Sequence, residues 1–197
     1  MNIESKDKVS LLEDVLGTSL PNEIRDISMQ KLSSMTEDAL LKITGIKKKT
    51  AKRIAATFEL GRRSMQSEAE KIIDKISSSG DIYRLLIHHV QHKPIEEFWV
   101  VYMDMGNKVL STERVSVGGV SACYVDRKVI LKRALELDAS VIAVAHNHPS
   151  GRCNPSIQDL SITSKIKDAA KLIDICLIDH IITCDSGYYS FSDEGTL

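Results

Sequence analysis

Residues 141–159 read VIAVAHNHPSGRCNPSIQD, and this stretch decides the fold of the chain. It opens on five consecutive apolar residues, the pattern of a β-strand that is buried on both faces of a sheet. A polar loop containing glycine and proline follows, and Ser156 then precedes a segment with the apolar spacing of a helix. The stretch therefore predicts a strand, a loop and a helix in succession, within a domain that mixes a sheet with helices.

The segments on either side of this stretch extend the same prediction. Two runs rich in β-branched and aromatic residues flank a turn at Gly106-Asn107, which is typical of a β-hairpin. Helical spacing and strand-like runs alternate through the rest of the C-terminal part. The expected strands are residues 98–103, 109–117, 141–145, 175–183 and 188–191, and the expected helices are residues 126–137 and 156–173.

The first part of the chain has a different character. Apolar residues recur at helical spacing from about residue 9 to residue 64, with breaks at Gly17, Pro21 and Gly45. A polar segment that carries a short helix follows, and it ends in a serine-glycine run typical of a boundary. We therefore expect a small all-helical domain over residues 1–64, a linker over 65–79 and a mixed α/β domain over 80–197.

The composition is that of a soluble globular protein, with 197 residues, 43% hydrophobic residues and a formal net charge of −1. No run approaches the roughly 18 apolar residues that a membrane span needs, and the polar start MNIESKDKVS does not resemble a signal peptide. We expect a cytoplasmic protein with no membrane association. The cysteines form no CxxC pair, so we expect free thiols at Cys123, Cys153, Cys176 and Cys184.

The polar loop holds residues that bind metals in other proteins. His146 and His148 are two residues apart at the end of the buried strand, so both imidazoles point to one side. Asp159 lies in the first turn of the next helix, where it is a candidate third ligand. Two histidines and one carboxylate, with a fourth position left for water, form a catalytic zinc site. Ser156 and Asp159 also fit a capping box, and the two roles can coexist.

These residues carry a resemblance to a known family. The string His146-x-His148-Pro149 followed by Ser156-x-x-Asp159 resembles the JAMM signature of MPN-type metalloproteases. Over nearly the whole chain, the closer resemblance is to the bacterial RadC family. It rests on HNHPSG, on Pro155-Ser156, Asp159 and Thr163, on Leu177-Ile178-Asp179-His180, and on Tyr189-Ser190-Phe191 with Gly195. The resemblance implies a JAB/MPN fold, a mixed sheet sandwiched by helices and related in shape to cytidine deaminases.

The resemblance also implies roles for single residues. His146, His148 and Asp159 would hold one Zn²⁺ per chain, and Ser156 would help to stabilise the oxyanion of a tetrahedral intermediate. A glutamate would be the general base on a zinc-bound water. The family places it two residues before the aromatic that opens the first strand, which selects Glu96. Glu97, which points to the other side of the strand, and Glu113 remain alternatives.

Some residues depart from the family pattern or have no assigned role. Asp126-Arg127-Lys128 stands where many members carry Pro-Arg-Glu, so the role of that segment is not transferred. Asp179 and His180 match a family string, but no role follows from the sequence. We interpret His180 as a hydrogen-bonded strand histidine rather than a metal ligand.

The helical part contains a basic segment. From Lys42 to Arg63 there are eight basic residues and one acid, Glu59. Residues 39–54 resemble a helix-hairpin-helix, in which a turn aims backbone N–H groups at a phosphate. Lys47 replaces the second turn glycine, where a positive φ would strain a lysine. The segment predicts DNA as a partner, contacted by Lys47, Lys48, Lys49, Lys52 and Arg53.

The sequence as a whole favours a zinc-dependent hydrolase of JAMM type that cleaves an amide or isopeptide bond in a protein or peptide substrate. A second hypothesis is a DNA repair or recombination accessory protein in which the metal site is regulatory. A third is a binding module that keeps the fold without catalysis. Zinc stoichiometry separates the third hypothesis from the others, and the class of substrate separates the first two.

Overall fold

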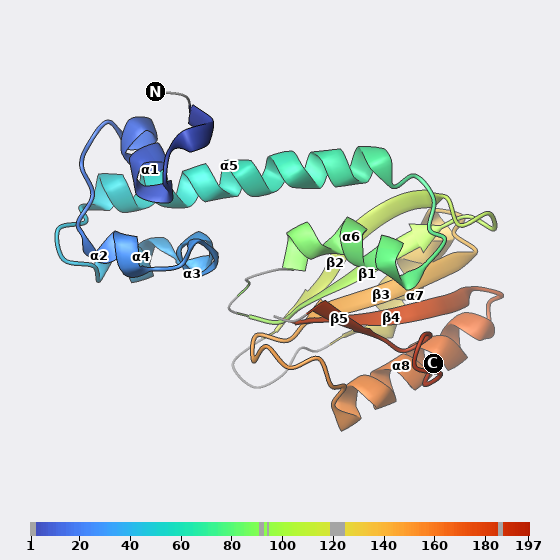
Figure 1. Ribbon diagram of the computed structural model, residues 1–197. Helices are drawn as coiled ribbons and strands as arrows, with labels where there is room; N and C mark the ends of the chain where they lie inside the picture. Colours follow the sequence, from blue (N-terminus) through green and yellow to red (C-terminus); the bar gives the residue numbers. More distant parts are fainter. Residues whose placement is uncertain (1–2, 91–92, 94, 119–124, 185–186) are drawn as a thin grey trace. The chain divides into compact units, whose positions relative to one another are not determined.

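The chain divides into two compact units, Met1–Met65 and Gln66–Leu197, which are described separately (Figure 1). The computed structural model describes residues 3–90, 93, 95–118, 125–184 and 187–197, and for residues 66–72 it describes the backbone alone. Cys123 and residues 185–186, between the last two expected strands, lie outside the described residues. Within the described part, no helix combines the length and apolar character that a membrane crossing requires.

The first unit is helical, and polar side chains set where its short helices begin. The Asp7 carboxylate accepts hydrogen bonds from the backbone N–H groups of Val9 and Ser10, and Ser28 and Thr36 cap later helices in the same way. Gly17, with φ of 65°, ends the first helix. The elements are η1 Ile3–Ser5, α1 Lys8–Leu16, α2 Glu23–Asp26, α3 Met29–Ser34, α4 Glu37–Leu41 and the start of α5 Lys48–Ile72. They enclose an apolar core that includes Leu12, Ile24, Leu32, Leu40 and Ile54.

Helix α5 is longer than the sequence pattern suggests. It runs unbroken for 25 residues to Ile72, whereas a polar linker with a separate short helix is expected over residues 65–79. The segment after Gly61 contains neither glycine nor proline until Gly80, so nothing in it interrupts a helix. Glu59 also forms ion pairs with Arg62 and Arg63, which lie one turn further along. Ion pairs at this spacing stabilise a helix.

The second unit is built on a five-stranded mixed sheet with the order β2-β1-β3-β4-β5. Strands β1 and β2 form the expected hairpin, β1 pairs antiparallel with β3, β3 pairs parallel with β4, and β4 pairs antiparallel with β5. The elements are α6 Ser79–Val90, β1 Glu97–Met103, β2 Val109–Val117, α7 Arg127–Glu136, β3 Val141–Asn147, α8 Ile157–Lys171, β4 Cys176–Cys184 and β5 Gly187–Ser190. The mixed α/β fold expected from the sequence is confirmed, and it is consistent with a JAB/MPN domain.

Helices cover both faces of this sheet. Phe98, Val100 and Tyr102 alternate along β1 and pack with residues of α7 and α8 on one face. Val101 and Met103 point to the opposite face and pack with residues of α6. Every residue of β3 is buried, as the apolar run predicts for a central strand between two helical layers.

The strand directions bring distant chain segments to one edge of the sheet. The parallel strands β3 and β4 both end there, and the antiparallel strand β1 begins there. The backbone N–H of His148 donates to the carbonyl of Thr183 across this edge, at 3.0 Å. The loop after β3 then leads into α8, so the residues of the predicted metal site lie at this edge.

Candidate metal centre

Two histidines and one aspartate converge at the end of β3. The Nε2 atoms of His146 and His148 are 3.0 Å apart. The carboxylate of Asp159, from the first turn of α8, lies between them, with Oδ1 3.2 Å from His146 Nε2 and Oδ2 3.4 Å from His148 Nε2. His146 is fully buried and Asp159 is buried, while His148 is partly exposed. The structure thus brings together the three residues that the sequence predicts as ligands.

The hydrogen bond made by Nδ1 of His148 favours a cation beside Nε2 of the same ring. Nδ1 of His148 lies 2.6 Å from the carbonyl of Arg152, which can only accept, so Nδ1 carries the hydrogen. When the ring is neutral, its Nε2 lone pair therefore faces His146 and Asp159. Nitrogen and carboxylate oxygen donors in this combination suit zinc, so the donor set fits the metal that the resemblance implies.

Asp159 has two roles at the start of α8. One carboxylate oxygen, Oδ2, accepts hydrogen bonds from the backbone N–H and the hydroxyl of Ser156, at 2.7 and 2.6 Å. The Asp159 N–H in turn donates to the Ser156 hydroxyl, which completes a capping box. The capping box and the contacts with the histidines are both present, so the two interpretations of Asp159 do not compete. The cap also fixes the carboxylate beside the imidazoles.

The charges of the cluster are shifted in the direction that mutual attraction produces. Burial by itself raises the pKa of Asp159, but the adjacent imidazoles of His146 and His148 outweigh it and hold the pKa well below its ordinary value. The hydrogen bond to Asp159 raises the pKa of His148, against the lowering effect of burial. Asp159 is therefore an anion at neutral pH, as a metal-ligating carboxylate must be.

The two candidate glutamates before β1 lie in different surroundings. The β1–β3 register ends with Phe98 opposite His146, and Glu96 lies two residues before Phe98. Glu96 lines the same cleft as His148 and Asp159. Glu97 is 4% exposed; it forms an ion pair with Arg114 at 3.0 Å and accepts a hydrogen bond from the Trp99 indole. The structure therefore places Glu96, and not Glu97, beside the cluster.

The remaining glutamate considered from the sequence, Glu113, lies on the edge strand β2. Its carboxylate accepts hydrogen bonds from the Arg133 guanidinium at 2.8 and 3.1 Å. These hydrogen bonds, the largest contribution, lower the pKa of Glu113. Its interactions join β2 to helix α7, and it is not among the residues that line the cleft.

A cleft of about 1080 Å³ opens beside the cluster, between α7 and α8. Phe98, Leu131 and Ile162 form apolar parts of its wall, and Ser156 lies on it next to Asp159. Sequence reasoning did not find this cleft, because α7 and α8 are distant in sequence and meet only in the folded chain. Asp126, Arg127 and Lys128, which differ from the family pattern, form part of its wall.

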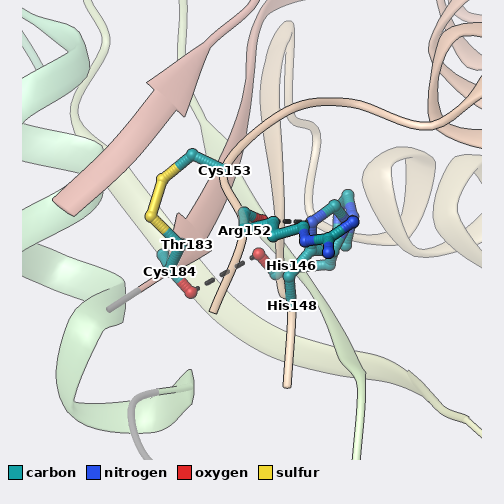
Figure 2. The surroundings of a disulfide bond; sticks show 6 residues. All are labelled: His146, His148, Arg152, Cys153, Thr183 and Cys184. Atoms are coloured by element: carbon teal, nitrogen blue, oxygen red, sulfur yellow. Dashed lines mark hydrogen bonds between the residues drawn. A yellow bond between two sulfur atoms is a disulfide. The ribbon is translucent and has the colours of Figure 1, made fainter. Parts of the chain in front are cut away.

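Two cysteines are joined beside this site, contrary to the expectation of free thiols. Cys153 and Cys184 form a disulfide with a Cα–Cα distance of 5.2 Å (Figure 2). The physical reason is the parallel β3–β4 pair, which brings the loop after β3 next to the end of β4. Cysteines 31 residues apart carry no local signal of pairing. Cys176 is free and exposed, as expected.

The basic segment lies in the first unit, where its turn is regular. Gly45 has φ of 89°, which suits glycine. Among the described residues, those with positive φ other than glycine are Asn107, Asp138 and Asp174, so Lys47 carries no such strain. Lys47 instead precedes α5, and its carbonyl accepts the N–H of Ala51. Arg53 donates to the carbonyl of Leu16 at 2.9 Å and so also has a structural role.

Comparisons with known proteins agree with this geometry. Residues 76–196 match the family model described as the RadC-like JAB domain. A UPF0758 protein of Flavobacterium johnsoniae is 39% identical over 85% of this chain and 73% of its own length. One from Methanosarcina mazei is 38% identical over 98% of this chain and 87% of its own length, and one from Streptococcus suis is 32% identical over 96% and 74%. The chain therefore belongs to the RadC-like JAB domain family.

Proposed function

We propose that this protein is a zinc-dependent hydrolase of JAMM type that cleaves an amide or isopeptide bond. The observation that carries the proposal is the convergence of His146, His148 and Asp159 at the edge of a cleft that Glu96 also lines. Metal ligands, a candidate base and room for a substrate then occur at one place. A zinc ion held there would polarise a carbonyl and lower the pKa of a coordinated water to about 7.

The side chains of this chain divide the remaining work. Glu96 would accept a proton from the attacking water and give it to the leaving nitrogen as the C–N bond breaks. The Ser156 hydroxyl, which donates to Asp159 in this structure, would turn toward the oxyanion that forms on the carbonyl oxygen. The apolar wall at Phe98, Leu131 and Ile162 would hold the substrate and exclude water from the reacting bond.

Metal content tests the proposal first. After zinc is supplied and excess removed by dialysis, elemental analysis should find about one zinc per wild-type chain and none in the His146→Ala/His148→Ala variant. His88→Ala is the matched control, because His88 lies in α6 and is absent from the cluster; it should bind zinc as the wild type does. The loaded wild type then goes into a screen of peptide and isopeptide substrates.

One result would contradict the assignment of the metal ligands, and another would contradict the proposed enzymatic function. A double variant that retains one tightly bound zinc would place the metal elsewhere. A wild type that takes up none would leave the fold as a binding module, the third hypothesis drawn from the sequence.

A second function, DNA binding, is favoured by the first unit. Lys47, Lys48, Lys49 and Lys52 are all exposed and lie around the start of α5, next to the glycine turn. Backbone N–H groups at a helix start and nearby cations are suited to phosphate. We propose that this unit contacts DNA without sequence preference, which keeps the DNA-associated accessory role open beside hydrolysis.

The triple variant Lys47→Ala/Lys48→Ala/Lys49→Ala should weaken DNA binding and flatten its dependence on salt. If each lysine neutralises one phosphate, the slope of log K against log salt falls by about 2–3. Fluorescence anisotropy with a labelled duplex at several salt concentrations measures this. The control removes three exposed lysines of the second unit, Lys108, Lys132 and Lys171, and should bind as the wild type does. An unchanged slope in the Lys47→Ala/Lys48→Ala/Lys49→Ala variant would contradict the proposal that this unit binds DNA.

A further inference from the structure

His180 and Thr163 are connected to His146 by hydrogen bonds. The family resemblance includes both residues but assigns neither of them a role. His180 is on β4, the strand parallel to β3, and its ring is fully buried. The ring packs against Phe191, at 4.7 Å between centroids, and against Phe98, at 5.6 Å. Thr163 is on α8, one turn after Asp159, and is also buried. Neither residue is in the group that could hold the metal.

Hydrogen bonds connect these two residues to His146 in a single chain. Nδ1 of His146 is 2.8 Å from Nε2 of His180, and Nδ1 of His180 is 2.6 Å from the hydroxyl of Thr163. The same hydroxyl is 2.6 Å from the backbone carbonyl of Asp159. The chain thus starts at the backbone of one ligand, Asp159, and ends on the ring of another, His146.

The direction of every hydrogen bond follows from the carbonyl end of this chain. A carbonyl can only accept, and a threonine hydroxyl has one hydrogen to give. Thr163 therefore donates to Asp159 and must accept from His180, so the hydrogen of His180 is on Nδ1. His180 lies between two aromatic rings with no exposed surface, where a charged imidazolium would be costly, so its Nε2 has a lone pair.

The last hydrogen bond is then fixed as well. Because Nε2 of His180 accepts, Nδ1 of His146 must donate. This leaves the lone pair of His146 on Nε2, the atom that lies 3.2 Å from Asp159 and 3.0 Å from His148 Nε2. The opposite tautomer would put a hydrogen at the point where the three candidate ligand atoms converge.

We propose that His180 and Thr163 are positioning residues that hold His146 in the tautomer and ring orientation required to bind the metal. The proposal deepens the function proposed above, because it rests on His146 as a ligand. Partners of this kind, when removed, typically cost about 10–100-fold in metal affinity. Loss of the Thr163 hydroxyl would let His180 move its hydrogen to Nε2, and His146 would then carry its own hydrogen on the metal side.

Two pairs of variants separate this role from simple packing. Thr163→Val keeps the shape of the side chain and removes the acceptor, while Thr163→Ser keeps the hydroxyl. His180→Leu removes both ring nitrogens, while His180→Gln retains an oxygen that can accept from His146 and an NH₂ group that can donate to Thr163. The conservative member of each pair should rescue the function that the apolar member loses.

Two readouts decide the proposal. Competition with a chromophoric chelator should show zinc affinity reduced about 10–100-fold in Thr163→Val and His180→Leu, and nearly restored in Thr163→Ser and His180→Gln. In the metal-free protein, ¹⁵N chemical shifts should place the hydrogen of His146 on Nδ1 in the wild type and Thr163→Ser, and move it to Nε2 in Thr163→Val. A merely structural role would lower stability without moving this hydrogen.

The possible failures are distinguishable from one another. If Thr163→Val and His180→Leu leave the zinc affinity and the His146 tautomer unchanged, the positioning role is wrong, even though the metal site is intact. A wild type that binds no zinc would contradict the proposed function, and the tautomer in the metal-free protein would still decide the hydrogen-bond chain. If Thr163→Val does not fold, Thr163→Ala gives the same comparison with Thr163→Ser.

Discussion

Glu96→Gln should bind zinc as tightly as the wild type and lose about 10²–10⁴-fold in turnover of any substrate found for the loaded protein. Glutamine has nearly the same shape as glutamate, but it cannot accept a proton from water. Glu96 lines the cleft with His148 and Asp159 and is not one of the three converging ligands, so the metal should remain. Elemental analysis and steady-state kinetics on the same preparation separate the two properties.

The neighbouring residue provides the control for this experiment. Glu97→Gln makes the same chemical change one position along, on the opposite side of the strand. It removes the ion pair with Arg114 but retains an oxygen that can accept from the Trp99 indole. We expect a loss of stability with little change in turnover. Normal turnover in Glu96→Gln together with a large loss in Glu97→Gln would reverse the assignment of the base.

The parts of the molecule that sequence reasoning found are those encoded by neighbouring residues. The β-rich run of residues 98–103 predicts a strand of a hairpin, and β1 lies there, with Phe98 and Val101 in opposite cores. The two histidines share a strand end, and Asp159 is placed by a capping box that its own sequence neighbours form. The cluster could be predicted because each ligand is fixed within its own element and the elements follow one another in the chain.

The parts that sequence reasoning missed depend on pairing between distant segments. The parallel register of β3 and β4 sets Val144 beside His180 and so brings the buried ring behind His146. The same pairing joins Cys153 to Cys184. The sequence shows the family segment that contains His180, but only the register of β3 and β4 shows that His180 contacts His146.

Reduction of the Cys153–Cys184 disulfide should destabilise the second unit by about 3–4 kcal/mol, because the bond closes a loop of 31 residues in the unfolded chain. Denaturant unfolding of the metal-free protein measures this. Trp99 reports it selectively, since it is the only tryptophan of the chain and lies in this unit. The wild type treated with a phosphine reductant and the untreated Cys153→Ser variant should unfold at the same, lower denaturant concentration.

Cys176→Ser is the matched control, because Cys176 is on the same strand as Cys184 and is free. It should unfold like the wild type and remain sensitive to the reductant, whereas Cys153→Ser should be insensitive. Equal unfolding midpoints for the reduced and the untreated wild type would show that the bond contributes nothing to stability.

The position of the disulfide links this stability to the metal centre. Cys153 follows Arg152, whose carbonyl accepts from Nδ1 of His148 (Figure 2). Cys184 follows Thr183, whose carbonyl accepts from the backbone N–H of His148. The bond therefore ties together the two segments that orient this ligand. In zinc titrations, reduction should weaken affinity through His148, while the tautomer of His146, held from behind by His180, should stay as it is.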